Sequence, residues 1–348
     1  MMQEIFQKRQ TEIKEKWLKL LGGIPDKRPV PDAKIILEEQ GDGYRKIKVS
    51  LAADTDHADD RIYAWLLLPD HVTAPLPVIL ALHPTTGGCG KDIVIGEPER
   101  LLPLSAWTKM SPQMIRNRAY GVDLVKAGFA VFAPDIYGEG ERIEPGHRCH
   151  DISTFTQRYP TWSAVGKTIY DNMIAIDWLS TLPEIDAKRI GVVGHSLGGH
   201  SSIFLAGLDE RVTATCSNGG VTRFNKELEH WARVPMPEEL KDSYPPVYTY
   251  IPNFLPYMAH SEIPNPLEFG DVMSLIAPRP LLYAGSINSA GTPGLVEVHQ
   301  KTWDAAYEMY ILANAEEAIE YSIYPGDHDF PPRARKVTVD WFKRVLNH

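Results

Sequence analysis

A serine between two glycines is the first feature of this sequence that could carry out chemistry. Residues Gly194–Gly198 read Gly-His-Ser-Leu-Gly; they follow an apolar run, Ile190–Val193, and precede a helix-like stretch over 201–206. A serine at such a strand-turn-helix junction adopts strained backbone angles and presents its hydroxyl above the edge of the sheet. The flanking glycines avoid β-carbons that would push the strand and the helix apart. The pattern predicts that Ser196 is a nucleophile; the alternative is an ordinary turn with a solvent-facing serine.

A histidine late in the chain is suitably placed to activate this serine. A serine hydroxyl becomes a good nucleophile only when a neighbouring base takes its proton. Residues 321–324 are predicted to form the last strand and 325–330 the loop after it, and this loop contains His328. In catalytic triads whose serine lies on this kind of turn, the order along the chain is serine, then acid, then histidine. The base is therefore expected in a late loop. We predict that His328 is the general base; the alternative is a surface-loop histidine, one of twelve in the chain.

Composition narrows the class of protein. The 348 residues are 43% hydrophobic and 23% charged, which is ordinary for a globular protein. The net charge of −9 argues against nucleic acid or an anionic membrane as the main partner. Three irregularly spaced cysteines, Cys89, Cys149 and Cys216, predict reduced thiols in a cytoplasmic protein. The first residues do not resemble a signal peptide, and no apolar run approaches the length of a membrane span.

Alternating strand and helix patterns indicate how these residues are positioned. A helix is predicted over 3–21, and an antiparallel pair of strands over 44–51 and 61–68. Further strands are predicted over 78–82, 129–135, 190–193, 212–217, 280–284 and 321–324, and further helices over 115–126, 165–179, 295–313 and 335–346. This alternation predicts an α/β fold with a mostly parallel central sheet and helices on both faces.

From about Tyr44 to its C-terminus, the chain resembles α/β-hydrolases of the dienelactone hydrolase and acetyl xylan esterase-like branch. Besides the turn at Ser196, the resemblance is carried by residues 82–87, 133–140, 186–191 and 276–282. It implies the α/β-hydrolase fold and ester-type hydrolysis, but no particular substrate.

Three long segments interrupt the alternation of strands and helices. They cover about 88–112, 137–162 and 222–270 and are rich in proline, glycine and aromatic residues. Long insertions in a compact domain are often functional, and in open α/β sheets the ligand crevice lies at the carboxyl ends of the strands. We therefore expect an N-terminal helix and arm over 1–43, followed by an α/β-hydrolase domain over 44–348 whose insertions form a cap over Ser196.

The tetrahedral intermediate of ester cleavage needs preorganised donors for its oxyanion. One is expected to be the backbone N–H of Leu197, at the N-terminus of the helix after the nucleophile. The other should come from the loop after the strand over 78–82. Because Pro84 has no N–H, Thr85 is the predicted donor and Thr86 the alternative. His83 resembles the family's structural histidine and is interpreted as a hydrogen-bonded scaffold residue.

The acid of the catalytic triad is not found at its expected position in the sequence. The resemblance implies an aspartate in the turn after the strand over 281–285, but Asn288 stands where it is expected. An asparagine can orient an imidazole but cannot stabilise the imidazolium by charge, and in serine proteases this exchange is severely damaging. Three possibilities stay open: a carboxylate from elsewhere serves, with Glu227, Glu229 and Asp271 as candidates by position; Asn288 completes a weaker triad; or the chain is a poor catalyst.

The sequence thus predicts a serine hydrolase that cleaves a small acyl or acetyl ester through an acyl-enzyme on Ser196. The alternatives are a small-cap serine peptidase or aminopeptidase and a weakly catalytic ligand-binding protein on a hydrolase fold. Residues 147–151 have side chains that suit zinc, but their spacing matches no standard framework, so a polar cap loop is favoured. We expect a small-molecule ester substrate, no cofactor or metal, no nucleic-acid or membrane partner, and leave a homo-oligomer open.

Overall fold

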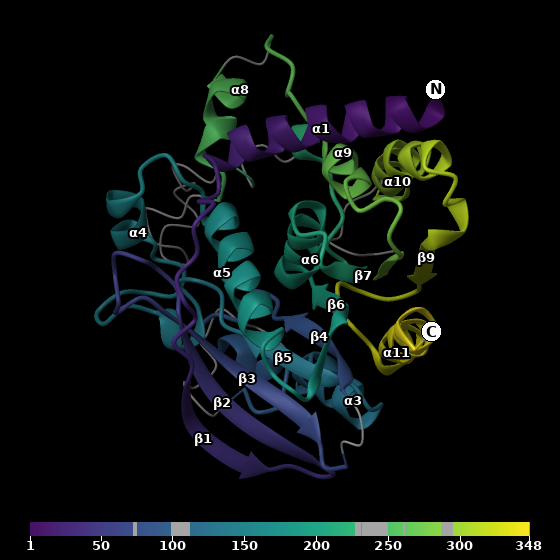
Figure 1. The fold of residues 1–348 in the computed structure, drawn as a ribbon. Coiled ribbons are helices and arrows are strands. Elements are labelled where there is room, and N and C mark those ends of the chain that lie inside the picture. The colour runs from purple at the N-terminus through teal and green to yellow at the C-terminus, as the bar shows by residue number, and fades with distance from the viewer. Residues whose placement is uncertain are drawn as a thin grey trace.

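The computed structural model describes residues 1–71, 75–98, 112–226, 231, 250–259, 262–286 and 295–347. In this part of the chain, nine strands form one sheet in the order β1-β2-β3-β5-β4-β6-β7-β8-β9 (Figure 1). β4 to β9 run parallel to one another, whereas β1, β2 and β3 pair in antiparallel fashion, as do β3 and β5. Their bounds are β1 (Lys34–Gln40), β2 (Tyr44–Ala52), β3 (Arg61–Pro69), β4 (Leu76–Leu82), β5 (Ala130–Pro134), β6 (Ile185–His195), β7 (Val212–Asn218), β8 (Leu281–Ser286) and β9 (Ile319–Tyr324).

Helices cover both faces of this sheet, as predicted. Figure 1 shows α1, α5, α6, α9 and α10 on one side, and α3 and α11 on the other. The α-helices are α1 (Met2–Leu21), α2 (Pro112–Asn117), α3 (Tyr120–Lys126), α4 (Ser153–Arg158), α5 (Ala164–Leu179), α6 (Leu197–Leu208), α8 (Leu255–Ala259), α9 (Phe269–Ser274), α10 (Leu295–Leu312) and α11 (Pro332–Leu346). Short 3₁₀ turns are η1 (Gly90–Ile93), η2 (Gly140–Arg142), η3 (Phe224–Lys226), η5 (Pro252–Phe254) and η7 (Glu316–Ala318). Among the described helices, none combines the length and apolar character that a membrane crossing needs.

Two core layers explain the continuous apolar runs of the central strands. Along β4, Val78, Leu80 and Leu82 join the core beneath α1, α5 and α6, while Ile79 and Ala81 point to the core beneath α3 and α11. Because successive side chains of a strand alternate between faces, a strand covered on both sides must be apolar throughout. This burial holds the carboxyl ends of β4, β6 and β7 beside one another.

The N-terminal helix packs into the first of these cores. Trp17 is fully buried, and its ring lies 5.0 Å from that of Phe204 and 5.8 Å from that of Phe224. The helix ends at Leu21 because Gly22 adopts the left-handed conformation, at a φ of 79°. The start of the first predicted insertion is also internal, since residues 88–95 are buried. The division into an arm and a domain with a cap stays a prediction.

One predicted element was wrong, and one strand was not predicted. The predicted helix over 115–126 is broken into α2 and α3, and at the break the Gly121 N–H donates to Val94 O (3.1 Å) instead of to a carbonyl of α2. β1 was not predicted at all. Its seven residues are almost wholly exposed and show no alternation, so only pairing with β2 defines it as a strand. The other predicted helices and strands are confirmed within a few residues of their ends.

Candidate active site

Ser196 lies between β6 and α6 in the strained conformation that its setting predicted. Its φ is 55° and its ψ −116°, a region that a residue with a β-carbon adopts only when its surroundings impose it. Those surroundings are two backbone hydrogen bonds. The Ser196 N–H donates to Asn218 O (2.9 Å), and the His200 N–H donates to Ser196 O (3.1 Å). The turn is therefore attached to the end of β7 as well as to its own helix.

The predicted need for glycine on both sides of this serine is confirmed. A β-carbon on Gly198 would lie 1.9 Å from Leu82 O, and one on Gly194 would lie 2.2 Å from the carbonyl carbon of Gly198. Both contacts are with backbone, which cannot move aside as a side chain can. The first turn of α6 thus packs directly on the ends of β6 and β4, and this places the loop after β4 beside Ser196.

That loop contains the predicted second oxyanion donor. The Thr86 N–H donates to Glu139 Oε1 (3.1 Å), so this alternative donor is already engaged. Thr85 is half-buried, and no acceptor in the described part of the chain takes its N–H. His83 Nε2 accepts from the Ile136 N–H (3.1 Å) and its Nδ1 donates to Pro84 O (2.7 Å), which makes His83 a scaffold residue as interpreted. Leu197 is the first residue of α6, and the donor roles of Leu197 and Thr85 stay predictions.

His328 reaches the same place from the loop after β9. Its ring lies close to Gly219, where an added β-carbon would come within 3.1 Å of His328 Cε1. Gly219 has a φ of +58° and directly follows Asn218, whose carbonyl holds Ser196. The structure therefore places Ser196 beside Asn218 and His328 beside Gly219, two consecutive residues at the end of β7. Burial lowers the pKa of His328 to about 4, with the charge of Arg118 acting in the same direction and that of Asp329 opposing it. A neutral imidazole is what a general base requires.

Sequence reasoning missed a hydrogen-bonded chain around this histidine. His195 Nδ1 donates to Asn218 Oδ1 (2.7 Å), Asn218 Nδ2 donates to Tyr324 Oη (2.7 Å), and Tyr324 Oη donates to Asp329 O (2.7 Å). The His195 ring centroid lies 4.8 Å from that of His328. Burial, together with His328 and Arg118, holds the pKa of His195 well below its usual range, so His195 is neutral. The position of His195 directly before Ser196 was the one signal in the sequence that could have indicated a role for His195.

The triad acid is not assigned by the described residues. Asn288, Glu227 and Glu229 lie outside them. Asp271 accepts the Glu268 N–H (2.8 Å) in the capping box of α9, so its carboxylate has a structural role. The role of Asn288 stays a prediction.

A buried carboxylate anchors the oxyanion loop from the second predicted insertion. Glu139 accepts the N–H and the hydroxyl of Thr86 and the N–H of Gly88 (3.2 Å), and lies 2.9 Å from His150 Nε2. Burial acts to raise the pKa of Glu139, but His150, His83 and Thr86 outweigh it and bring it to about 2. Glu139 is thus an anion that fixes the loop carrying Thr85.

Glu139, Cys149 and His150 also form the one group of potential metal ligands found among the described residues. Their ligand atoms lie within 4.8 Å of one another. The Glu139 oxygens, however, are already occupied by the Thr86 and Gly88 donors, and burial raises the pKa of the Cys149 thiol, which keeps it protonated. Zinc is bound by thiolate, so this chemistry supports a polar loop more than a metal framework.

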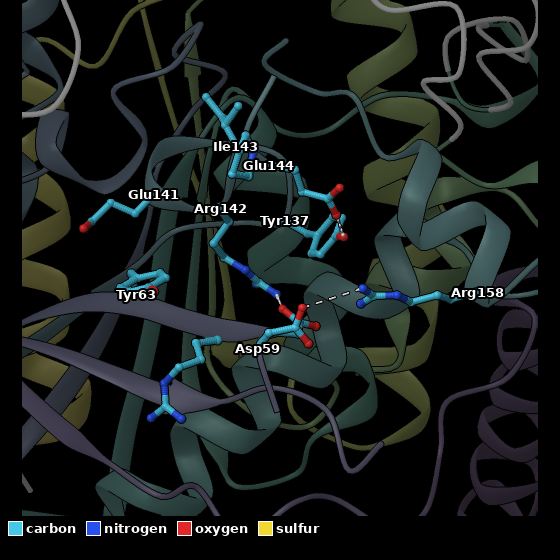
Figure 2. Close-up of a pocket in the computed structure, with 11 residues that line it drawn as sticks. Asp59, Tyr63, Tyr137, Glu141, Arg142, Ile143, Glu144 and Arg158 are labelled. Atoms are coloured by element: carbon cyan, nitrogen blue, oxygen red, sulfur yellow. Dashed lines mark hydrogen bonds and ion pairs between the residues drawn. The ribbon is translucent and has the colours of Figure 1, made fainter. Parts of the chain in front are cut away.

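A polar cavity of about 480 Å³ lies between the start of β3 and the segment around η2 (Figure 2). Figure 2 shows Arg142 and Arg158 directed at aspartates and the Tyr137 hydroxyl at Glu144. The cavity includes neither Ser196 nor His328. It is lined by Asp59, Asp60, Arg61, Tyr63, Tyr137, Glu141, Arg142, Ile143, Glu144, Pro145 and Arg158. The second predicted insertion thus forms part of the wall of this cavity, and charged side chains that line it pair with one another.

The mostly parallel sheet, the strained serine between β6 and α6, and the histidine after β9 define an α/β-hydrolase. The chain belongs to the Abhydrolase family, whose model matches residues 1–325, including α1. The predicted fold and the resemblance to α/β-hydrolases are thereby confirmed, and the protein is a hydrolase.

Individual relatives are more distant. YtaP of Bacillus subtilis (strain 168), which carries the name of a hydrolase, is 24% identical over 287 residues, or 81% of this chain and 82% of that protein. The carbohydrate esterase MZ0003, from an unknown prokaryotic organism, is 25% identical over 201 residues, or 52% of this chain and 44% of that protein. Among solved structures, a glucuronoyl esterase from Solibacter usitatus matches with a TM-score of 0.70 and 20% identity over 96% of this chain and 91% of that chain. This last likeness shows the shared fold.

Proposed function

We propose that this hydrolase cleaves carboxylic esters through an acyl-enzyme on Ser196, with His328 as the general base. The observation that carries the proposal is that both residues lie beside the end of β7. Asn218 O holds the strained backbone of Ser196, and the next residue, Gly219, makes room for the His328 ring.

Each chemical step has a group to perform it. His328 takes the proton of Ser196 Oγ while the oxygen attacks the ester carbonyl carbon, and the N–H groups of Leu197 and Thr85 receive the oxyanion. The imidazolium then gives its proton to the leaving alcohol, which leaves the acyl group on Ser196. Water, activated by His328, attacks the acyl-enzyme and releases the acid, and the proton returns to Ser196 Oγ.

The proposed substrate is a small acyl or acetyl ester carried by a sugar. The support comes from the similarity to a carbohydrate esterase. Small size of the acyl group was the expectation from the sequence, and a panel of acetyl, butyryl and octanoyl p-nitrophenyl esters tests it. Fastest turnover of the octanoyl ester would contradict this part of the proposal.

Turnover of p-nitrophenyl acetate tests the nucleophile and the base. Ser196→Ala and His328→Ala should each abolish it, because no other group replaces the acyl acceptor or the base. Ser202→Ala is the matched control, since Ser202 Oγ donates to Gly198 O (2.7 Å) in the same helix and takes no part in the proposed chemistry. Retained turnover in folded Ser196→Ala would overturn the proposal.

A fluorophosphonate probe separates an enzyme from a binding protein on the same fold. The probe should label the wild type at one residue and leave Ser196→Ala unlabelled. A folded wild type that stays unlabelled would favour the weakly catalytic ligand-binding protein instead.

The cytoplasm is the proposed location. Cys89, Cys149 and Cys216 are all free thiols, and burial raises the pKa of both Cys89 and Cys216 to about 12, which leaves them protonated and unreactive. Fractionation of the source cells tests this proposal, and recovery of the protein outside the cytoplasm would contradict it.

A further inference from the structure

Arg118, in the break between α2 and α3, is a buried cation next to the proposed base. We propose that Arg118 is a positioning residue for His328, which acts through the His195 ring and through Asp329, and that its charge opposes the protonated form of the base. This inference rests on the proposed role of His328 in catalysis. It gives a reason for the interruption of a helix that the sequence predicted to be continuous.

One set of contacts runs from Arg118 to the loop of His328. Arg118 Nη1 lies 3.8 Å from Asp329 Oδ1, and Asn117 Nδ2 donates to the other carboxylate oxygen of Asp329. Two adjacent residues thus hold the side chain that directly follows His328. The break in the helix is what allows both to face the same carboxylate.

A second set of contacts runs through His195. Arg118 Nη2 lies 3.5 Å from His195 Nε2, and the ring of His195 lies against that of His328, with 4.8 Å between centroids and 35° between planes. Because His195 Nδ1 donates to Asn218, its Nε2 carries no proton and presents a lone pair to the guanidinium. Arg118 therefore contacts the edge of the His195 ring, and that ring packs against His328.

The pairing of Arg118 is weak for a buried charge. Only 5% of Arg118 is exposed, and the carboxylate oxygen that it faces in the described part of the chain, Asp329 Oδ1, lies 3.8 Å away. By contrast, the buried Arg142 lies 2.5 Å from Asp171 and 2.8 Å from Asp60. A buried charge is costly unless closely paired, and imperfect pairing beside a reacting group is typical of functional sites. Arg118 Nη1 also donates to Met114 O (3.0 Å), so the guanidinium is held in place while its charge acts on His328.

The direction of that field follows from the groups around the base. The charged and titratable groups that face His328 from the described elements are Arg118, His195 at the end of β6, and Asp329 on its own loop. His195 is neutral. Burial is the largest influence lowering the pKa of His328; Arg118 lowers it further and Asp329 raises it. Removing Arg118 must then make His328 easier to protonate, and removing the Asp329 charge must make it harder.

The pH dependence of kcat/KM for p-nitrophenyl acetate tests the inference with three variants. The acid limb is the part of this profile where kcat/KM falls as the pH is lowered. Arg118→Gln should move the acid limb to higher pH, whereas Arg118→Lys, which keeps the charge, should leave it close to that of the wild type. Asp329→Asn should move it to lower pH, because the Arg118 cation then faces His328 without its counter-ion. Two shifts of opposite sign cannot arise from general loosening of the site.

An unchanged limb in folded Arg118→Gln, or equal shifts in the glutamine and lysine variants, would overturn the inference. If Arg118→Gln does not fold, as judged by circular dichroism, Arg118→Met takes its place, since it also removes the charge, and a limb that stays or moves to lower pH overturns the inference. His328→Ala separates this result from failure of the proposed function. Activity retained in His328→Ala removes both proposals, while its loss together with an unmoved Arg118→Gln limb removes only the role of Arg118.

Discussion

The phenolic hydroxyl of Tyr324 donates a hydrogen bond of 2.7 Å to the backbone carbonyl oxygen of Asp329. Tyr324 is the last residue of β9 and Asp329 directly follows His328, so this bond closes the loop that carries the proposed base. The same hydroxyl accepts from Asn218 Nδ2 (2.7 Å), which ties the loop to the end of β7. The position of His328 is thus set by groups outside the predicted triad.

Tyr324→Phe should lower kcat for p-nitrophenyl acetate with little change in KM. The substitution keeps the buried ring but removes the donor to Asp329 O and the acceptor for Asn218, so His328 is held less firmly while the acyl pocket is unaffected. The free energy of unfolding should fall by about 1–3 kcal/mol, the usual cost of leaving a buried partner unsatisfied. Urea denaturation and steady-state kinetics measure both effects.

Tyr321→Phe is the control for this experiment. Tyr321 lies on the same strand, but 68% of it is exposed and the structure gives its hydroxyl no comparable role. Its substitution should change neither kcat nor stability. If Tyr324→Phe behaves like Tyr321→Phe, the loop of His328 does not depend on the Tyr324–Asp329 bond.

The enzyme should remain active well into the acid range. The pKa of His328 is lowered to about 4, from an ordinary histidine value near 6.5, by burial first and by Arg118 second. A base with a lowered pKa loses its proton-accepting form only when the pH falls below that pKa. The acid limb of kcat/KM for p-nitrophenyl acetate is therefore expected near pH 4, and a limb near pH 6.5 would show that His328 is solvated in the free enzyme.

The parts of the site that sequence reasoning found are those with a local signature. The turn at Ser196 is a run of five residues that can be recognised in the sequence, even though Asn218 and Leu82 from other strands complete its packing. His328 follows a recognisable last strand, so its place in the order of the triad was enough to predict its role. The strands buried on both faces were found for the same reason, since burial leaves an apolar run in the sequence.

The parts that it missed depend on contacts between distant segments. Arg118 and His195 are 77 residues apart, and Asn218 and Tyr324 are 106 apart, so no spacing rule connects them. Arg118 was predicted to lie inside a helix, where a charged residue is most simply solvated. Only the topology of the sheet brings these polar side chains to one edge, and β1 was missed because pairing with β2 alone defines it.

Gly198→Ala should prevent folding or destabilise the protein severely. The new β-carbon would lie 1.9 Å from Leu82 O, so α6 or β4 would have to shift. Gly207→Ala is the matched control in the same helix, since its β-carbon would come no closer than 3.4 Å to any neighbour. Because alanine favours a helix over glycine by about 1 kcal/mol, Gly207→Ala should leave the protein equally stable or more so. Thermal denaturation measures the pair, and similar behaviour of the two variants would contradict the close packing at Gly198.

Stability should fall as the pH is lowered from 7 towards 4. Burial lowers the pKa of His299 and of His328 to about 4 each, and the pKa of His195 lies well below its usual range. In the unfolded chain these histidines bind protons below about pH 6.5, while in the folded protein His299 and His328 do not until about pH 4, and the pKa of His195 is lowered in the same direction by burial. Between these values the unfolded state holds more protons, so the free energy of unfolding rises with pH and the stabilisation is lost as the pH falls.

Replacing His299 tests this linkage away from the proposed catalytic residues. His299 lies in a contact of 2.5 Å with the Tyr283 hydroxyl, in a cavity that includes neither Ser196 nor His328. His299→Gln removes one of the titrating groups, so the slope of unfolding free energy against pH between 4.5 and 6.5 should become shallower, whatever its effect at pH 7. His71→Gln, at an exposed position, is the control and should leave the slope unchanged. Urea denaturation at several pH values gives both slopes, and an unaltered slope in His299→Gln would mean that His299 titrates alike in the folded and unfolded states.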